Sequence, residues 1–408
     1  MDADVAGNGP NRATLGARQS SLRSLNLATV LKQLYGAATP PSRADIAAAT
    51  GLTRSTVSRL VDELIVHGFA RDLDPVFDGQ RGRPAVPLAP PAATWAGVGL
   101  EVNISHLAVR VVDLAGGVLA ERIVTGEYAG VAPERTLEAL AELAHEAIAD
   151  VGIDTRLAGI QLALPGLVDA ARGVLLRAPN LGWRNVTPAP ALADVHGLTG
   201  LRVGLGNEAD YAALTVARTA PGRPAASSDF LYLSGEVGIG SSLVSHGSVM
   251  TGRHGWAGEI GHVCVDPAGP VCACGASGCL ERYAGQYALT AAAGVPDTDA
   301  LVRALEAGDA QAMDAADRAG RALGVALSGA LNLLDVSQVI LGGHLGVLAP
   351  YLRTGILAEL NVRVLSAPFE APTVDAVALD PAPAALGAAY VALEDLLSRP
   401  ADFMADLG

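Results

Sequence analysis

The sequence predicts an α/β protein preceded by a small helical domain. After the prolines at 87–91, apolar runs with strand periodicity alternate with amphipathic helical runs, which is the pattern of α/β domains. Before them, short helical patterns are joined by tight turns that contain glycine. The 408 residues are also too many for one ordinary domain, so two or three domains are expected.

The first helical pattern follows a polar leader. Residues 1–20 show no apolar period, and we expect them to form a disordered leader. Apolar side chains then recur with helical spacing over 25–35, and the segment 36–41, which runs from glycine to proline, ends that helix. Residues 21–89 are therefore predicted to form the N-terminal domain.

Two further helices have clear start signals. Ser42 begins the second helix, and Asp45 three residues later gives a variant of the capping box. Gly51 allows a short turn, and Thr53 opens the third helix. Two short helices joined by such a turn predict a helix-turn-helix.

The third helix carries polar side chains opposite its buried stripe. Small hydroxyls and arginines on an exposed helical face suit insertion into the major groove of DNA, although a solvated amphipathic helix has the same pattern. The segment 68–70 is typical of the start of a winged hairpin, which favours the DNA-binding interpretation. The expected DNA-contacting residues of this helix are Arg54, Ser55, Thr56, Ser58 and Arg59.

A basic segment lies near the end of the predicted wing. Arg81, Gly82 and Arg83 belong to an Arg-Gly-Arg-Pro sequence that resembles the core of an AT-hook. An extended, cationic segment that is narrow at glycine fits the narrow minor groove of A·T-rich DNA. The alternative is a flexible basic linker.

The rest of the chain has the strand and helix patterns of the α/β body. Strands are expected over 96–102, 107–112 and 117–124, followed by a helix over 133–150 and a strand over 157–163. Because the first three strands are joined by short turns, we expect the body to open with an antiparallel meander.

Charge separates the two parts of the chain. Residues 1–89 hold ten basic and eight acidic residues, whereas residues 90–408 hold 18 basic and 34 acidic ones. A mildly basic head on an acidic body indicates that only the head meets a polyanion. No apolar run is long enough to span a membrane, and no signal peptide is expected, so we expect a cytoplasmic protein.

All four cysteines lie within 264–279, close to a histidine. His262, Cys272, Cys274 and Cys279 offer three thiolates and one imidazole, a set that suits one tetrahedral structural Zn²⁺ per chain. Cys264 is an alternative to His262 as the fourth ligand.

Glu259 and Glu281 flank the predicted metal loop, and neither is needed as a ligand once four N and S donors are present. The pattern Glu-x-Gly-His followed by Cys-x-Cys-Gly-x-x-Gly-Cys-x-Glu resembles the signature of the ROK family of sugar kinases and sugar-responsive repressors. The resemblance runs from about residue 22 to the C-terminus. It implies a two-lobed, actin-like body with lobe 1 over 90–208, lobe 2 with the zinc loop over 209–383, and a C-terminal helix within 384–408 that packs on lobe 1.

The resemblance also implies a sugar site. It assigns sugar contacts to two glutamates and the histidine of the motif, and to an asparagine-containing loop and an Asn-Glu pair earlier in the chain. Trp183, next to that loop, is expected either to form an apolar wall of the site or to lie in the core. The expected sugar-binding residues are Asn180, Asn207, Glu208, Glu259, His262 and Glu281.

Kinase activity is not expected. ROK kinases carry a glycine-rich phosphate turn where this chain has the segment from Glu101 to Ser105. Side chains at these positions obstruct the close backbone approach that phosphate binding needs. The aspartate of the kinases is Glu208 here, and Glu236 places a carboxylate where a triphosphate would lie.

These features predict a sugar-responsive repressor of carbohydrate genes, associated with the nucleoid when bound to DNA. Its expected partners are a sugar effector and operator DNA, an inverted repeat with A·T-rich flanks bound by a homodimer or a dimer of dimers. One alternative is a ROK-type ATP-dependent sugar kinase with a fused DNA-binding head. The other is a DNA-binding protein whose body only oligomerises.

Overall fold

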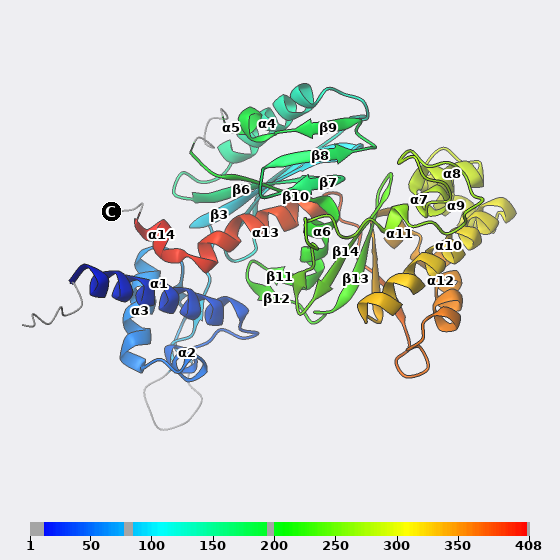
Figure 1. Ribbon diagram of the computed structural model, residues 1–408. Coiled ribbons are helices and arrows are strands. Elements are labelled where there is room, and N and C mark those ends of the chain that lie inside the picture. Colours follow the sequence, from blue (N-terminus) through cyan, green and yellow to red (C-terminus); the bar gives the residue numbers. More distant parts are fainter. Residues whose placement is uncertain (1–11, 77–84, 194–199, 406–408) are drawn as a thin grey trace, which may run out of the picture.

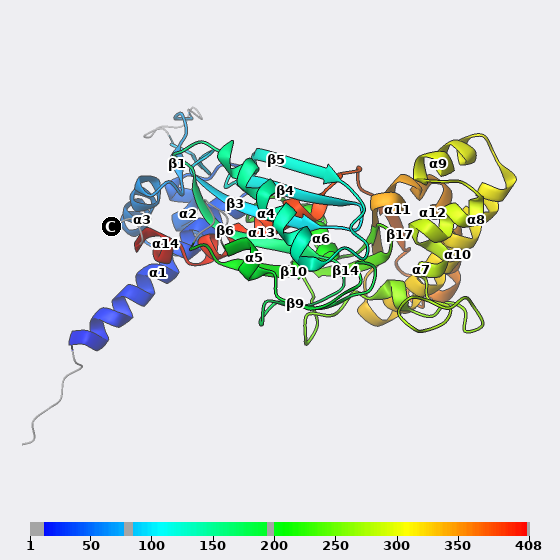
Figure 2. The ribbon, with the colours of Figure 1, turned by 90° about the horizontal axis from the view of Figure 1, so that it is seen from above.

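The structure, a computed structural model, describes residues 12–76, 85–193 and 200–405. The head stands at one end of the molecule, lobe 1 lies in the middle and the helices of lobe 2 lie at the other end (Figures 1 and 2). Within the described residues, no helix has both the length and the apolar character needed to cross a bilayer.

The predicted helix-turn-helix is present in the head. The Ser42 hydroxyl accepts from the Asp45 amide, and the Asp45 carboxylate accepts from the Ser42 amide at 2.8 Å, so the capping box is complete. Gly51 ends the second helix with φ of 72°, which glycine adopts without strain. The helices are α1 (Arg12–Gly36), α2 (Arg43–Thr50) and α3 (Arg54–Val66).

The first helix begins earlier than the sequence predicted. We expected a disordered leader over 1–20, but α1 starts at Arg12. The segment from Arg12 to Gly36 contains no proline, and extending an existing helix is much easier than nucleating one. The apolar pattern over 25–35 identified the part of the helix that contributes to the apolar core of the head.

A short hairpin follows α3 as the predicted wing. Its strands β1 (Arg71–Asp72) and β2 (Leu88–Ala89) are antiparallel, and a bridge between Val76 and Ala85 extends the pairing toward the tip. Arg81, Gly82 and Arg83 belong to the segment 77–84, which lies outside the described residues.

The body contains two five-stranded sheets with the same topology. In each sheet the first three strands form an antiparallel meander, a fourth strand pairs in parallel with the first, and a fifth pairs in parallel with the fourth. This repetition is the duplication expected of an actin-like body. The lobe 1 strands are β3 (Trp95–Val102), β4 (His106–Asp113), β5 (Val118–Thr125), β6 (Arg156–Leu164) and β10 (Val203–Asn207); the lobe 2 strands are β13 (Phe230–Gly235), β14 (Ile239–Ser245), β15 (Ser248–Val249), β16 (Gln338–Gly342) and β17 (Thr373–Ala376).

The strand and helix boundaries predicted for lobe 1 agree with these to within one or two residues. On lobe 1 lie α4 (Pro133–Ala149), α5 (Ala189–Ala193) and a small sheet of β7 (Leu167–Asp169), β8 (Val174–Ala178) and β9 (Trp183–Val186). Between the lobes run α6 (Glu208–Ala217), β11 (Arg218–Ala220) and β12 (Arg223–Pro224). Lobe 2 adds the 3-10 turn η1 (Ile260–His262), α7 (Glu281–Ala284), α8 (Gln286–Ala293), α9 (Thr298–Glu306), α10 (Ala310–Leu334), α11 (Gly343–Val347) and α12 (Ala349–Arg363).

The last long helix, α13 (Pro383–Ser398), returns to lobe 1 and packs across β3, β4 and β6, as the family resemblance implied. Gly97 and Gly99 of β3 permit this approach, because a Cβ on either would lie within 2.4 Å of a carbonyl oxygen of the helix. The far end of α13 and the short α14 (Pro400–Ala405) enter the core of the head. That core joins Leu27, Val30, Leu31, Val57, Leu60 and Phe69 of the head to Trp95, Leu114, Leu393, Leu396 and Met404.

Candidate functional site

A cavity of about 210 Å³ opens between the two lobes. Lobe 1 contributes the ends of its strands and the loop after β8, and lobe 2 contributes the β13–β14 turn and the segment around η1. All six residues assigned to sugar contacts from the sequence line this cavity, although they come from four separate segments: Asn180, Asn207, Glu208, Glu259, His262 and Glu281.

Short-range contacts hold the polar groups in place. Asn207 ends β10 and caps α6, with Oδ1 accepting from the Ala209 amide at 2.8 Å and Nδ2 donating to the Gly166 carbonyl at 3.0 Å. Glu208 is therefore fixed as the first residue of a helix. Across the cavity, the Glu281 carboxylate accepts from the Ile239 amide at 3.3 Å.

Gly238 explains how Glu281 and Asn180 reach the same part of the cavity. A Cβ at Gly238 would lie 2.4 Å from Glu281 Oε2 and 2.9 Å from Asn180 Nδ2. Any side chain at this position would displace one of the two groups. The glycine of the β13–β14 turn is thus a requirement of the site, because it lets this turn of lobe 2 lie close to Asn180 of lobe 1.

Several carboxylates share the inner part of the cavity. Burial, with the negative charges of Glu236 and Glu101, raises the pKa of Glu208 well above its usual range. Burial and the charge of Glu101 raise the pKa of Glu236 to about 7. Burial also raises the pKa of Glu259. Such a lining favours hydroxyl groups, which donate to carboxylates, and disfavours anions.

Arg177, on β8, lines the same cavity and was not identified from the sequence. Its Nε is buried and has no hydrogen-bond partner among the described residues. An unsatisfied buried donor beside carboxylates is suited to an acceptor oxygen of a bound ligand. The only signal in the sequence was an arginine within an otherwise apolar strand, three residues before Asn180.

The predicted metal ligands converge at the edge of the cavity. One donor atom from each of His262, Cys272, Cys274 and Cys279 can be chosen so that all lie within 4.8 Å of one another. Cys274 Sγ and Cys279 Sγ are 3.6 Å apart. Tetrahedral zinc with Zn–S bonds of about 2.3 Å places its sulfurs at about 3.8 Å, so the donor set and its spacing fit this ion. Cys264 is exposed and lies outside the cluster, and the structure therefore favours His262 as the fourth ligand.

The segment from Glu101 to Ser105, where the family resemblance places the phosphate turn of ROK kinases, is filled by its own side chains. Glu101 and Asn103 are 2% and 3% exposed. Glu101 bonds to His106, and Asn103 donates to Glu208 at 3.3 Å. Desolvation lowers the pKa of His106, but the hydrogen bond and charge of Glu101 outweigh it, so the net pKa is raised. Glu236 Oε1 lies 2.9 Å from where a Cβ of Gly343 would be, which places this carboxylate against the Gly342-Gly343 turn.

Trp183 belongs to the core. It is 2% exposed, and its Nε1 donates to the Val131 carbonyl at 2.8 Å. The sequence left this residue open between a wall of the site and the core, because an aromatic side chain beside a loop has the same appearance in both cases.

On the head, the structure exposes Arg54, Ser55 and Arg59 on α3 and leaves Thr56 and Ser58 half-buried. The hydroxyls of Ser55 and Thr56 lie 3.0 and 2.8 Å from the N-cap hydroxyl of Thr53. The two arginines are therefore the long side chains that this face presents to solvent.

Comparison with known proteins gives a consistent result over the chain. Residues 97–395 match the ROK family, and residues 25–74 match the IclR helix-turn-helix domain. The chain is 26% identical to the xylose repressor of Caldicellulosiruptor bescii over 382 residues, which span 88% of this chain and 93% of that protein. A solved ROK family transcriptional regulator, described as a homologue of the Escherichia coli MLC protein, superposes with a TM-score of 0.77 at 24% identity, covering 95% of this chain and all of that one. A ROK hexokinase from Thermus thermophilus superposes with a TM-score of 0.59 at 31% identity, covering 76% of this chain and 99% of that enzyme.

Proposed function

The chain belongs to the ROK family, and we propose that it is a sugar-responsive repressor of genes for carbohydrate uptake or catabolism. The observation that carries the proposal is a helix-turn-helix head joined, through α13 and α14, to a body whose cleft is lined by the six polar residues that the family resemblance assigns to sugar contacts. The likeness to the xylose repressor of C. bescii, over most of both chains, supports the same function.

The proposed effector is a sugar that binds between the lobes. Carboxylates of Glu208, Glu259 and Glu281 accept hydrogen bonds from its hydroxyls, and Asn180 and Asn207 orient it. Because these groups lie on both lobes, the bound sugar favours one relative arrangement of the lobes. DNA binding changes only through this difference between arrangements.

We propose that His262, Cys272, Cys274 and Cys279 hold one structural zinc ion. When bound, zinc fixes the loop between η1 and α7 and supplies no reactive group. Cys279 precedes Glu281 by two residues and His262 follows Glu259 by three, so a fixed loop keeps both carboxylates directed at the cavity.

On DNA, α3 is proposed to enter the major groove, with Arg54, Ser55, Thr56, Ser58 and Arg59 as its contacts. Arg81, Gly82 and Arg83 are proposed to reach a flanking A·T-rich minor groove. An inverted-repeat operator follows if two chains act as a two-fold dimer.

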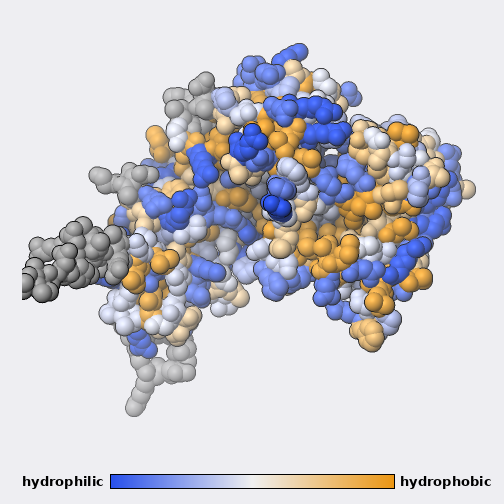
Figure 3. All heavy atoms as spheres, viewed as in Figure 1, coloured by the Kyte–Doolittle hydropathy of each residue, from blue (hydrophilic) through white to orange (hydrophobic). Residues whose placement is uncertain are grey.

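Exposed apolar side chains on lobe 2 supply a surface that such a dimer or dimer of dimers needs. Figure 3 shows orange atoms gathered over this half of the molecule. Phe369→Asp should lower the oligomeric state measured by sedimentation if this surface is the interface. The most exposed members of this set are Leu333, Val362, Leu365 and Phe369.

The second candidate function is a sugar kinase with a DNA-binding head, favoured by the 31% identity to the hexokinase. The buried side chains of Glu101 and Asn103, together with the carboxylate of Glu236 that lines the cavity, argue against a triphosphate at this end of the cleft. We therefore propose that the chain is not a kinase. A coupled assay of ADP release with D-glucose, D-xylose and N-acetyl-D-glucosamine separates the two: turnover with any of them would contradict the proposal.

The main test is a sugar panel scored by thermal shift, followed by DNA binding. The protein selects a duplex from a randomised pool, and its affinity for that duplex is measured with and without each stabilising sugar. A sugar that raises the melting temperature and changes the affinity supports a sugar-responsive regulator. A selected duplex with no responding sugar would instead indicate a body that only oligomerises.

A further inference from the structure

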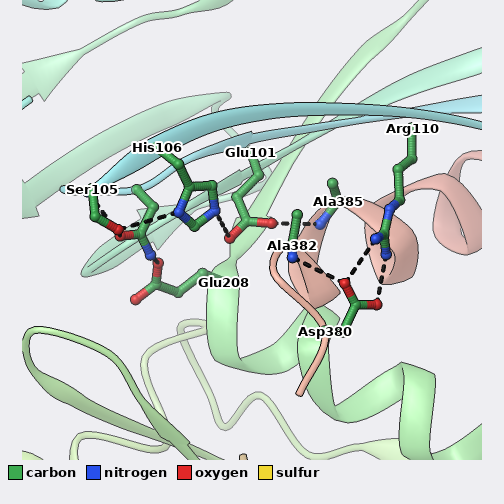
Figure 4. Close-up of polar contacts among 9 residues, drawn as sticks. Glu101, Ser105, His106, Arg110, Glu208, Asp380, Ala382 and Ala385 are labelled. Carbon is green, nitrogen blue, oxygen red and sulfur yellow. Dashed lines mark hydrogen bonds and ion pairs between the residues drawn. The ribbon is translucent and has the colours of Figure 1, made fainter. Parts of the chain in front are cut away.

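A continuous line of polar contacts leads from the cavity to the last long helix. It begins at Glu208, which lines the cavity and accepts from Asn103 Nδ2 at 3.3 Å. Asn103 Oδ1 accepts from the Ser105 hydroxyl at 3.2 Å, and Ser105 Oγ lies 3.3 Å from His106 Nδ1. Figure 4 shows Ser105, His106 and Glu208 close together beside the strands of lobe 1.

The line continues through Glu101 to α13. Glu101 Oε1 lies 3.2 Å from His106 Nε2, and Oε2 accepts from the backbone amide of Ala385 at 2.8 Å. That amide is in the first turn of α13, where backbone donors have no partner within the helix. With Ser105 donating to Asn103, both ring nitrogens of His106 face acceptors, an arrangement that favours the charged ring and agrees with the raised pKa of His106.

A second carboxylate holds the same end of the helix. Asp380 accepts two hydrogen bonds from Arg110, at 2.6 and 2.7 Å, and a third from the Ala382 amide at 3.0 Å. Arg110 is a residue of β4, so this contact ties the start of α13 to the sheet (Figure 4). Glu101 differs from Asp380 in one respect: the polar contacts of Glu101 lead on to Glu208 in the cavity.

The other end of α13 lies in the head. Leu393 and Leu396 are fully buried in the same apolar core as Leu31 of α1 and Leu60 of α3. Close-packed cores of this kind transmit small displacements because they have no free volume to absorb them. One rigid helix thus contacts the polar line at its first turn and the DNA-binding helices near its last.

We propose that Glu101 is a positioning residue that couples the sugar cavity to the DNA-binding head by holding the first turn of α13. The inference rests on the proposed function and assigns a role to the segment that replaces the phosphate turn. A sugar hydroxyl that donates to Glu208 competes with Asn103 for that carboxylate. The loss of the Asn103–Glu208 hydrogen bond shifts Asn103, Ser105 and His106. This shift weakens or strengthens the hydrogen bond between Glu101 and the Ala385 amide.

The decisive comparison uses two variants of similar size. Glu101→Leu fills the space without an acceptor, whereas Glu101→Gln keeps an oxygen for the Ala385 amide. Glu142→Gln, on the exposed face of α4, is the matched control. Each protein is titrated with the duplex selected by the unaltered protein, with and without the sugar that stabilises it most among D-xylose, D-glucose and N-acetyl-D-glucosamine.

In the unaltered protein and in Glu142→Gln, we expect the sugar to change duplex affinity by a factor between about 5 and 150. In Glu101→Leu the factor should fall below about twofold, while calorimetry still detects sugar binding. Glu101→Gln should retain a factor within about threefold of the unaltered protein. Loss in both variants also supports the coupling role and assigns it to the carboxylate charge. A full factor in Glu101→Leu would overturn the proposal.

Two further measurements keep the test decisive if Glu101→Leu does not fold, and they distinguish failure of this coupling from failure of the proposed function. If Glu101→Leu does not fold, His106→Leu interrupts the line while leaving the bond to Ala385 in place, and it should show the same loss. Hydrogen exchange at the first turn of α13 should respond to sugar in the unaltered protein and not in His106→Leu; an equal response in both would refute the coupling. An unaltered protein with no sugar response at all contradicts the proposed function instead.

Discussion

The sulfur of Cys272 lies 3.9 Å from Nδ1 of His262, although ten residues separate them in the sequence. His262 and Cys272 are so near to each other, with the sulfurs of Cys274 and Cys279 beside them, that the two ends of a long loop lie together. The loop starts after Glu259 and ends before Glu281, so its shape determines where these carboxylates lie. Metal binding and sugar binding are therefore expected to fail together.

Cys272→Ser and Cys274→Ser should each lose zinc and the thermal shift produced by sugar, because serine is a poor ligand for zinc at this type of site. Cys264→Ser is the control, since Cys264 is exposed and outside the cluster. It should keep both properties. Elemental analysis and thermal shift measure the outcome, and a full equivalent of zinc in both ligand variants would refute the assignment.

Arg54→Ala should relax sequence preference on DNA. A good bidentate contact to a base discriminates by about 1–3 kcal/mol, so affinities for the selected duplex and for a scrambled one should converge by roughly that amount. Arg318→Ala, on the exposed side of α10, removes the same charge far from the head and should change neither affinity. Gel shifts with the two duplexes decide; an unchanged preference in Arg54→Ala removes this residue from base recognition.

Arg83→Ala should act on affinity more than on preference. Contacts in a narrow minor groove or to phosphate weaken binding broadly and reduce its dependence on salt. We expect weaker binding to duplexes with A·T-rich flanks, and a smaller effect when the flanks are G·C-rich. Titrations at two salt concentrations provide the measurement. Equal losses on both kinds of flank would argue for phosphate contact alone.

Glu281→Ala should produce a regulator that binds DNA and does not respond to sugar. The change removes a hydroxyl partner from the cavity, and the head lies far from it. Glu138→Ala on α4 serves as the control for loss of a carboxylate. Operator affinity without sugar should stay within about twofold of the unaltered protein, and calorimetry should detect no sugar. A wild-type response would place the pocket elsewhere.

A neutral sugar should bind more tightly than its phosphate ester. Glu208, Glu236, Glu259 and Glu281 line the cavity, with Arg177 as the arginine among the lining residues. An added dianion meets several carboxylates in a partly desolvated space, so we expect at least a tenfold loss, or about 1.4 kcal/mol. Calorimetry with D-glucose and D-glucose 6-phosphate measures it. Tighter binding of the phosphate would give Arg177 the dominant role.

Glu236→Gln should stabilise the protein at high pH. The folded pKa of Glu236, about 7, lies above the ordinary 4.5, so its contribution to stability is present below about pH 4.5 and is lost as the pH rises through 7. The difference corresponds to on the order of 3 kcal/mol at about 1.4 kcal/mol for each pKa unit. Urea unfolding at pH 5 and pH 8 should show the variant gaining relative stability at pH 8, and Glu142→Gln showing no such gain.

Local patterns in the sequence predicted much of the structure. The capping box at Ser42 and the meander that opens lobe 1 followed from local patterns, and the grouping of the six cavity residues followed from the resemblance to the ROK family. Arg177 was missed because one charged residue on a strand has many explanations. The contact between Glu101 and Ala385 joins residues 284 apart, and nothing near either of them in the sequence indicates the other.

The placement of α13 also has a consequence for synthesis of the chain. The helix-turn-helix is made first, but its apolar core is completed by Leu393, Leu396 and Met404, which are made last. Domains commonly fold in order as they emerge from the ribosome. Here the head lacks part of its core until the body has been translated, so the recognition helix of a chain interrupted before residue 383 is expected to be less stable. A fully packed head is therefore expected only in molecules that also carry the cleft between the lobes.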